Sequence, residues 1–254
     1  RRSTRTDVAT VAIGDIHGHL AALDDLLAQV LPRLAPDDHL VFLGDYVDRG
    51  PDTRGVLDRL VRLRAAAPCR VSFLLGNHEE WLLRTRADFT RHSWLAGMDG
   101  LTTVRSYDAA AAERLREAMW REGLRLVTER VTLPYDGFFD AVPAEHLALL
   151  EGLARFVRTP DVVCVHGGLD PQAGRAEEQD PHALTWGDEA FPDAYDGPDL
   201  VVYGHKADAV LDPSGWPRPR VTRGRAWGID TIQHGVLTAV RFPGGEVLQS
   251  ARHA

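Results

Sequence analysis

The feature that most constrains this fold is a repeated pattern in which a short apolar segment ends in glycine and a polar side chain follows. Segments 8–13, 40–43 and 71–75 have the character of buried strands, and apolar residues at helical spacing fill 20–34 and 53–66 between them. This order predicts a parallel sheet. Ligands bind at the carboxyl ends of strands in such sheets, so we expect the polar residues to converge there.

The rest of the chain changes character twice. Residues 79–159 are mostly helical by pattern, most clearly over 109–122 and 143–153, and we interpret residues 80–160 as a helical insertion in one domain spanning 1–254. The segment 213–225 is rich in proline and arginine and is predicted to be a loop. The strands predicted in the last third are 162–165, 200–203 and a hairpin of 235–242 with 246–249.

Composition and charge exclude several classes of partner. The formal net charge of -8 argues against nucleic acid, whose backbone needs a basic face. No apolar run reaches the roughly 20 residues that span a bilayer, and Arg1–Asp7 lacks the apolar stretch of a signal peptide. Cys69 and Cys164 form no metal-type pair and no disulfide framework, which favours a cytoplasmic location. The oligomeric state stays open.

The predicted strand ends carry side chains that can bind metal ions. Their donor atoms are carboxylate oxygens, an amide oxygen and imidazole nitrogens, a set that suits Mn²⁺, iron, Zn²⁺ or Mg²⁺. Each strand end presents one of them beside a glycine, which lets the backbone turn sharply and approach closely. Ordinary turn chemistry does not explain so many ligand-type residues at separate strand ends. They are Asp15, His17, Asp45, Asn77, His78, His166 and His205.

These residues lie in sequence blocks that resemble a known family. Residues 14–18, 44–50 and 76–79 are similar to the three signature blocks of the bacterial serine/threonine phosphoprotein phosphatases, which belong to the calcineurin-like metallophosphoesterase superfamily. Residues 166–168 and 204–205 resemble its two later histidine blocks. The resemblance, which extends to dinucleoside tetraphosphatases, implies an α/β fold: an αββα sandwich of two packed mixed β-sheets flanked by helices, with a helical insertion.

The resemblance also implies a centre of two divalent metal ions, Mn²⁺ by family habit with Fe, Zn or Mg as alternatives. A hydroxide bridging the ions would attack phosphorus directly. The ligands would be Asp15 and His17 for the first ion, Asp45 as the bridge, and Asn77, His166 and His205 for the second.

Other residues of the blocks would act on the substrate. His78 would be the general acid that protonates the leaving group, which typically contributes about 10²–10⁴-fold. Asp48 would bond the second ring nitrogen of His78, fix its tautomer and raise its pKa. Arg49 and Asn77 would bind the phosphate, Arg49 through its planar guanidinium. Glu79 is expected to support the site and not to bind metal.

One block departs from the family pattern. Many bacterial relatives have Trp-Ile-Arg after the fourth block, and that arginine helps to bind phosphate, whereas this chain has Trp186-Gly187-Asp188. The second phosphate-binding arginine is therefore unassigned. Its possible substitutes are Arg158, Arg175, Arg223 and Arg225.

Two enzymatic functions fit these residues. The first is hydrolysis of phosphate monoesters on phosphoserine, phosphothreonine or phosphotyrosine, with a phosphoprotein or small phosphoester as substrate. The alternative is hydrolysis of dinucleoside polyphosphates such as diadenosine tetraphosphate. The intact Asp48-Arg49 pair and Glu79 favour the phosphatase. A metal-free binding module would require the loss of a ligand, and the sequence retains them all.

Overall fold

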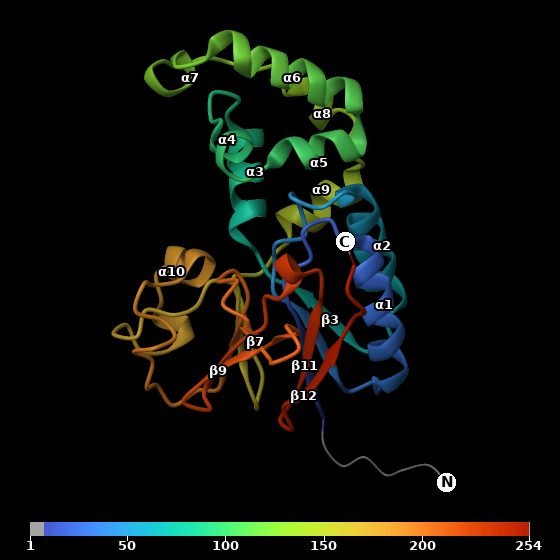
Figure 1. Ribbon diagram of the computed structural model, residues 1–254, viewed down its shortest axis with the longest axis vertical. Coiled ribbons are helices and arrows are strands. Elements are labelled where there is room, and N and C mark those ends of the chain that lie inside the picture. Colours follow the sequence, from blue (N-terminus) through green and yellow to red (C-terminus); the bar gives the residue numbers. More distant parts are fainter. Residues whose placement is uncertain (1–7, 254) are drawn as a thin grey trace.

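The computed structural model describes residues 8–253, and its central feature is a pair of five-stranded sheets (Figure 1). In order across the first sheet, the strands are β12 (Glu246–Gln249), β11 (Thr238–Phe242), β1 (Thr10–Ile13), β2 (His39–Phe42) and β3 (Arg70–Phe73). The strands β1, β2 and β3 are parallel, while β11 pairs antiparallel with β1 and β12 with β11.

The second sheet also has parallel strands at its centre and antiparallel strands at its edges. In order, its strands are β4 (Phe156–Arg158), β5 (Val163–Val165), β6 (Val201–Tyr203), β10 (Ala226–Gly228) and β9 (Arg220–Thr222). A separate ribbon pairs β7 (Val210–Leu211) with β8 (Pro217–Arg218). The expected arrangement of two mixed sheets is confirmed.

The two sheets share an apolar interface. Ala12 and Val41 from the first sheet belong to the same buried cluster as Cys164 and Val202 from the second. Successive residues of a strand point to opposite faces, so the neighbours of Ala12 pack on the other side, against helices. Burial on both faces explains why these strands read as continuous apolar runs.

Helices cover the outer face of the first sheet. They are α1 (Leu20–Val30), a 3₁₀ turn η1 (Leu31–Arg33) and α2 (Thr53–Ala66). The Asp52 carboxylate accepts the Gly55 N–H at 2.8 Å and so caps α2. The short helix α10 (Pro181–Trp186) and two further 3₁₀ turns, η2 (Ala176–Glu178) and η3 (Ile232–His234), complete this part of the chain.

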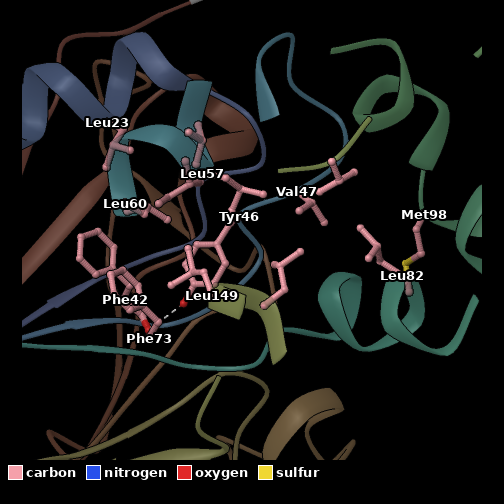
Figure 2. Packing of buried hydrophobic residues seen from close by; sticks show 14 of the residues in the cluster. Leu23, Phe42, Tyr46, Val47, Leu57, Leu60, Phe73, Leu82, Met98 and Leu149 are labelled. Atoms are coloured by element: carbon pink, nitrogen blue, oxygen red, sulfur yellow. Dashed lines mark hydrogen bonds between the residues drawn. The ribbon is translucent and has the colours of Figure 1, made fainter. Parts of the chain in front are cut away.

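The helices predicted for residues 80–160 lie between β3 and β4 and form one end of the molecule (Figure 1). Tyr46 and Val47 follow Asp45 in the chain. Figure 2 shows them packed among Leu57 of α2 and Leu82 and Met98 of this segment. The helices are α3 (Asn77–Ala87), α4 (Ser93–Gly97), α5 (Gly100–Tyr107), α6 (Ala109–Glu122), α7 (Arg125–Thr128), α8 (Asp136–Phe139) and α9 (Ala144–Glu151).

Three predicted elements differ from the structure. The helix expected over 20–34 ends at Val30 and continues as the 3₁₀ turn that contains Pro32. The segment 213–225, predicted to be a loop, contains β8 and β9, and β4 lies within the stretch predicted to be mostly helical.

None of the helices in residues 8–253 is long and apolar enough to cross a bilayer. The prediction for Arg1–Asp7 lies outside the described residues.

Candidate active site

Asp45 lies at the centre of the converging strand ends. Its Oδ2 is 3.4 Å from His17 Nε2 on one side, and its Oδ1 is 3.3 Å from His166 Nε2 on the other. The two carboxylate oxygens thus face two separate imidazoles, one following β1 and one following β5. Asp45 would be the residue shared by two cations bound on either side of it.

Two backbone carbonyls orient the imidazoles. His17 Nδ1 lies 2.9 Å from Val47 O, and His166 Nδ1 lies 2.9 Å from Leu43 O. Since a carbonyl accepts a proton from Nδ1, each Nε2 keeps its lone pair and directs it at Asp45. Burial lowers the pKa of both histidines well below the ordinary value, so both rings are neutral, as metal binding requires.

Asn77 and His205 lie with His166 on one side of Asp45 and form a possible ligand group with it. Asn77 Oδ1 lies 3.0 Å from His166 Nε2 and 3.0 Å from His205 Nδ1. With the amide turned over, its nitrogen would instead donate to these atoms and to Asp45. Every neighbouring atom is an acceptor, so the amide oxygen would face them only with a cation bound among them. Asp45, His166 and His205 can bring ligand atoms within 4.8 Å of one another.

Asp15 stands slightly apart from these groups. Its Oδ2 accepts the His205 N–H at 2.9 Å, while its Oδ1 is buried without a hydrogen-bond partner. Burial raises the pKa of Asp15 well above its usual range, and the carboxylates of Asp230 and Asp45 add to the rise. Asp230 accepts the Ala207 N–H at 3.0 Å, so it braces the loop after His205. An unpartnered buried carboxylate oxygen fits a metal ligand.

The loop around Asp45 has an unusual backbone. Non-glycine residues rarely adopt positive φ, and such residues concentrate at functional sites. Glu79 stabilises the loop: its carboxylate accepts the N–H groups of Asp45 at 2.9 Å, Tyr46 at 2.8 Å and Val47 at 3.1 Å. Glu79 thus supports the site, in agreement with the expectation. The site residues with positive φ are His17, Asp45, Asp48, Arg49 and His205.

His78 and Asp48 form a buried pair beside Asp45. His78 Nδ1 is 2.8 Å from Asp48 Oδ2, and His78 Nε2 is 3.9 Å from Asp45 Oδ2 with no hydrogen-bond partner of its own. His78 could therefore also join His17 and Asp45 as a ligand group. Asp48 binds Nδ1, so Nε2 is the ring atom that faces the centre.

The pKa of His78 corrects one expectation. We predicted that Asp48 raises it. The structure shows that burial lowers the pKa of His78, although the Asp45 carboxylate opposes the effect. Burial also raises the pKa of Asp48 to about 8, which weakens its charge as a counterion. Desolvation of the pair outweighs the mutual attraction.

Two residues that the sequence did not single out hold Asp48. Trp94 Nε1 donates to Asp48 Oδ2 at 3.0 Å, and Thr103 Oγ1 donates to Oδ1 at 2.6 Å. The Asp48 N–H in turn donates to Thr103 Oγ1 at 2.8 Å. Both residues come from the helical insertion, and neither lies in a local motif. Their role could be found only once the fold placed α4 and α5 over the loop.

A cavity of about 790 Å³ opens beside the centre. His17 and Arg49 lie on its wall, and Arg49 Nη1 is 2.9 Å from His17 Nε2. His19, His234 and His253 also line it. Two arginines, four histidines and no carboxylate line the cavity, which therefore suits an anion.

The arginines proposed as substitutes lie elsewhere. Arg158 forms ion pairs with Asp199 and Glu177, and it pairs across the sheet with Val163 at the amino end of β5, away from His166. Arg223 and Arg225 lie in the β9–β10 connection, at the amino end of β10. Arg175 lies 4.0 Å from Glu177. None of them lines the cavity.

On another side of the centre, Trp186 borders His205. Their ring centroids are 6.0 Å apart, and Trp186 Nε1 donates to Glu80 Oε2 at 2.8 Å. Trp81 and His182 pack against the same indole. Trp186 therefore borders the site at His205.

Comparison with known proteins assigns the family. The sequence profile described as calcineurin-like phosphoesterase matches residues 9–223. The chain belongs to this family. It is therefore a metallophosphoesterase, a hydrolase whose relatives use divalent metal ions, and the residues around Asp45 are the ones that would hold them.

Curated relatives match along nearly the whole chain. The symmetrical bis(5'-nucleosyl)-tetraphosphatase of Pectobacterium carotovorum subsp. carotovorum is 30% identical over 274 aligned residues, which cover 92% of each protein. The enzyme of the same name from Pectobacterium atrosepticum matches to the same extent.

Solved structures share the fold at lower identity. A candidate diadenosine tetraphosphatase has a TM-score of 0.61 at 24% identity, with 96% of this chain and 94% of that chain covered. The cold-active protein-tyrosine phosphatase of a psychrophilic Shewanella has a TM-score of 0.56 at 17% identity, with coverages of 96% and 80%. These likenesses confirm the predicted fold.

Proposed function

We propose that this metallophosphoesterase hydrolyses dinucleoside polyphosphates. The observation that carries the proposal is the cationic cavity of about 790 Å³ that continues outward from His17 and Arg49. A single phosphate group needs only the part next to the metal ligands, whereas a chain of phosphates with a nucleoside needs the rest. The names of the Pectobacterium relatives support the same substrate class.

Different residues of the site would have different roles in such a hydrolysis. When bound, the two cations supply an activated water molecule and neutralise phosphate charge. Arg49 would hold oxygens of the phosphate group under attack through its guanidinium. His78 would deliver a proton from Nε2 to the departing oxygen. Trp94 and Thr103 both donate to Asp48, which opposes the rise that burial causes in its pKa and holds its carboxyl group against His78 Nδ1.

Phosphate monoesters remain a second candidate, because one observation favours them. A serine alkoxide is a poor leaving group and depends on a proton donor, whereas a departing phosphate needs less help. The buried His78–Asp48 pair, at 2.8 Å, is such a donor. The two candidates share the metal chemistry and differ in the leaving group and in what occupies the cavity.

The test compares diadenosine tetraphosphate with a phosphoserine peptide in the presence of Mn²⁺, with products separated by chromatography. We expect a higher kcat/KM for the dinucleotide and ADP as its only nucleotide product, as a symmetrical cut requires. Preference for the peptide would contradict the proposed dinucleotide substrate but would still agree with metal-dependent hydrolysis. Absence of turnover for both, with Mn²⁺, Zn²⁺ and Mg²⁺ each supplied, would contradict the enzyme as well.

A further inference from the structure

The C-terminal segment, residues 250–253, contributes to the wall of the cavity. Its backbone is fixed at two points: the Ser250 N–H donates to Leu237 O at 2.9 Å, and the His253 N–H donates to Gly235 O at 2.7 Å. Arg252 lies between these two anchors and is one of the lining residues. The position of its backbone is therefore defined although the residue itself is exposed.

Two contacts orient the side chain of Arg252. Its Nη2 donates to Gly215 O at 2.8 Å, and its guanidinium carbon lies 5.2 Å from the ring centroid of Trp216. Stacking on an aromatic face holds a guanidinium flat without using its N–H groups. A guanidinium has five donors, so most of them stay available for an anion.

The charge of Arg252 is not used by another side chain. Within residues 8–253, neither Arg252 nor Arg49 forms an ion pair with a carboxylate, and these are the two arginines of the cavity wall. The nearby Arg218 shows the contrast, because it pairs with Asp212 at 3.1 Å. Two guanidinium groups that form no ion pair, on a wall whose lining residues include no carboxylate, make a binding site for an extended anion.

We propose that Arg252 binds a second phosphate group of the substrate while Arg49 binds the group at the metal ligands. This inference rests on the proposed function and narrows it to substrates whose phosphates form a chain. Arg252 would then be a specificity-determining residue supplied by the C-terminal segment, in place of the arginine that is missing after Trp186. The ligand class is a polyphosphate chain, with or without nucleosides.

The test replaces Arg252 with Gln and with Lys and follows two reactions. One is hydrolysis of diadenosine tetraphosphate, and the other is hydrolysis of p-nitrophenyl phosphate, inhibited by inorganic tripolyphosphate at constant free Mn²⁺. We expect Arg252→Gln to raise the tripolyphosphate inhibition constant and the tetraphosphate KM about tenfold, well beyond any change in KM for the monoester. Arg252→Lys should restore part of the loss.

Arg223→Gln is the matched control, because it removes the same charge from the β9–β10 turn at the other end of the sheet; it should change neither reaction. An unchanged tripolyphosphate constant in Arg252→Gln, with unchanged thermal stability, would overturn the inference. Equal losses for chain and monoester substrates would overturn it too. If wild type fails to cleave the dinucleotide but tripolyphosphate binding still depends on Arg252, the proposed function fails and the subsite stands.

Discussion

At the scale of single residues, close approach explains why glycine accompanies each ligand. A Cβ on Gly204 would lie 2.0 Å from Asp15 Oδ1, and a Cβ on Gly76 would lie 2.1 Å from Asp45 Oδ1. Any side chain at these positions would displace a carboxylate. The glycine before a ligand is thus part of the site, and this is why the blocks could be read from the sequence.

His78 provides the residue-scale prediction. His78→Asn should lower kcat by about 10²–10⁴-fold, because it removes the proton donor. The amide can still bond Asp48, and metal content should match wild type when measured by elemental analysis. Loss of metal would show that His78 is a ligand, an arrangement that its 3.9 Å distance from Asp45 also permits.

The roles of some site residues could be predicted from the sequence, and the roles of others could not. Asp48 and His78 could be paired in advance because both lie in recognised blocks. Trp94, Thr103 and Arg252 could not be assigned, because each acts through a contact between segments far apart in the chain. Arg252 and Arg49, for example, line the same cavity although about two hundred residues separate them in the sequence.

At the scale of elements, the helical insertion helps to build the site. Thr103 on α5 accepts the Asp48 N–H and donates to the Asp48 carboxylate, and it also lies 3.1 Å from the Thr53 hydroxyl at the start of α2. The insertion therefore fixes the loop that carries Asp48 and Arg49. A change in these helices would alter catalysis without touching the substrate.

Thr103→Val tests this coupling. The change keeps the shape of the side chain but removes both hydrogen bonds to Asp48, so we expect a loss of about 1–3 kcal/mol in the free energy of unfolding. The same change should lower kcat, because Asp48 orients His78. Thr102→Val is the matched control on the same helix, since its hydroxyl bonds only Asp99 O. Equal effects of the two substitutions in denaturant titration and kinetics would contradict the coupling.

Some helices and strands could be predicted from the sequence more accurately than others. The bounds predicted for α2 from its apolar spacing agree with the structure, in which Asp52 also caps the start of the helix. The strands β8 and β9 were missed, because proline and arginine suggest a loop and only pairing with β7 and β10 makes these residues strands. Short edge strands depend on tertiary contacts more than on pattern.

At the scale of the whole molecule, the site joins the two sheets. His17, Asp45 and Asn77 follow strands of the first sheet, whereas His166 and His205 follow strands of the second. Metal ions bound among them would hold the strand ends of both sheets together. Ligand binding to the folded state stabilises it, by about 2.7 kcal/mol at a hundredfold excess over the dissociation constant.

Asp45 faces both His17 and His166, so a centre of two metal ions would depend on it more than on any other residue. The decisive measurement is a calorimetric titration of the wild type and Asp45→Asn with Mn²⁺. We predict two ions per wild-type chain, and at most one weakly bound ion in the variant, because an amide cannot supply two anionic oxygens. A single ion in the wild type, or two ions bound with unchanged affinity by Asp45→Asn, would contradict the bridging role and the two-metal centre.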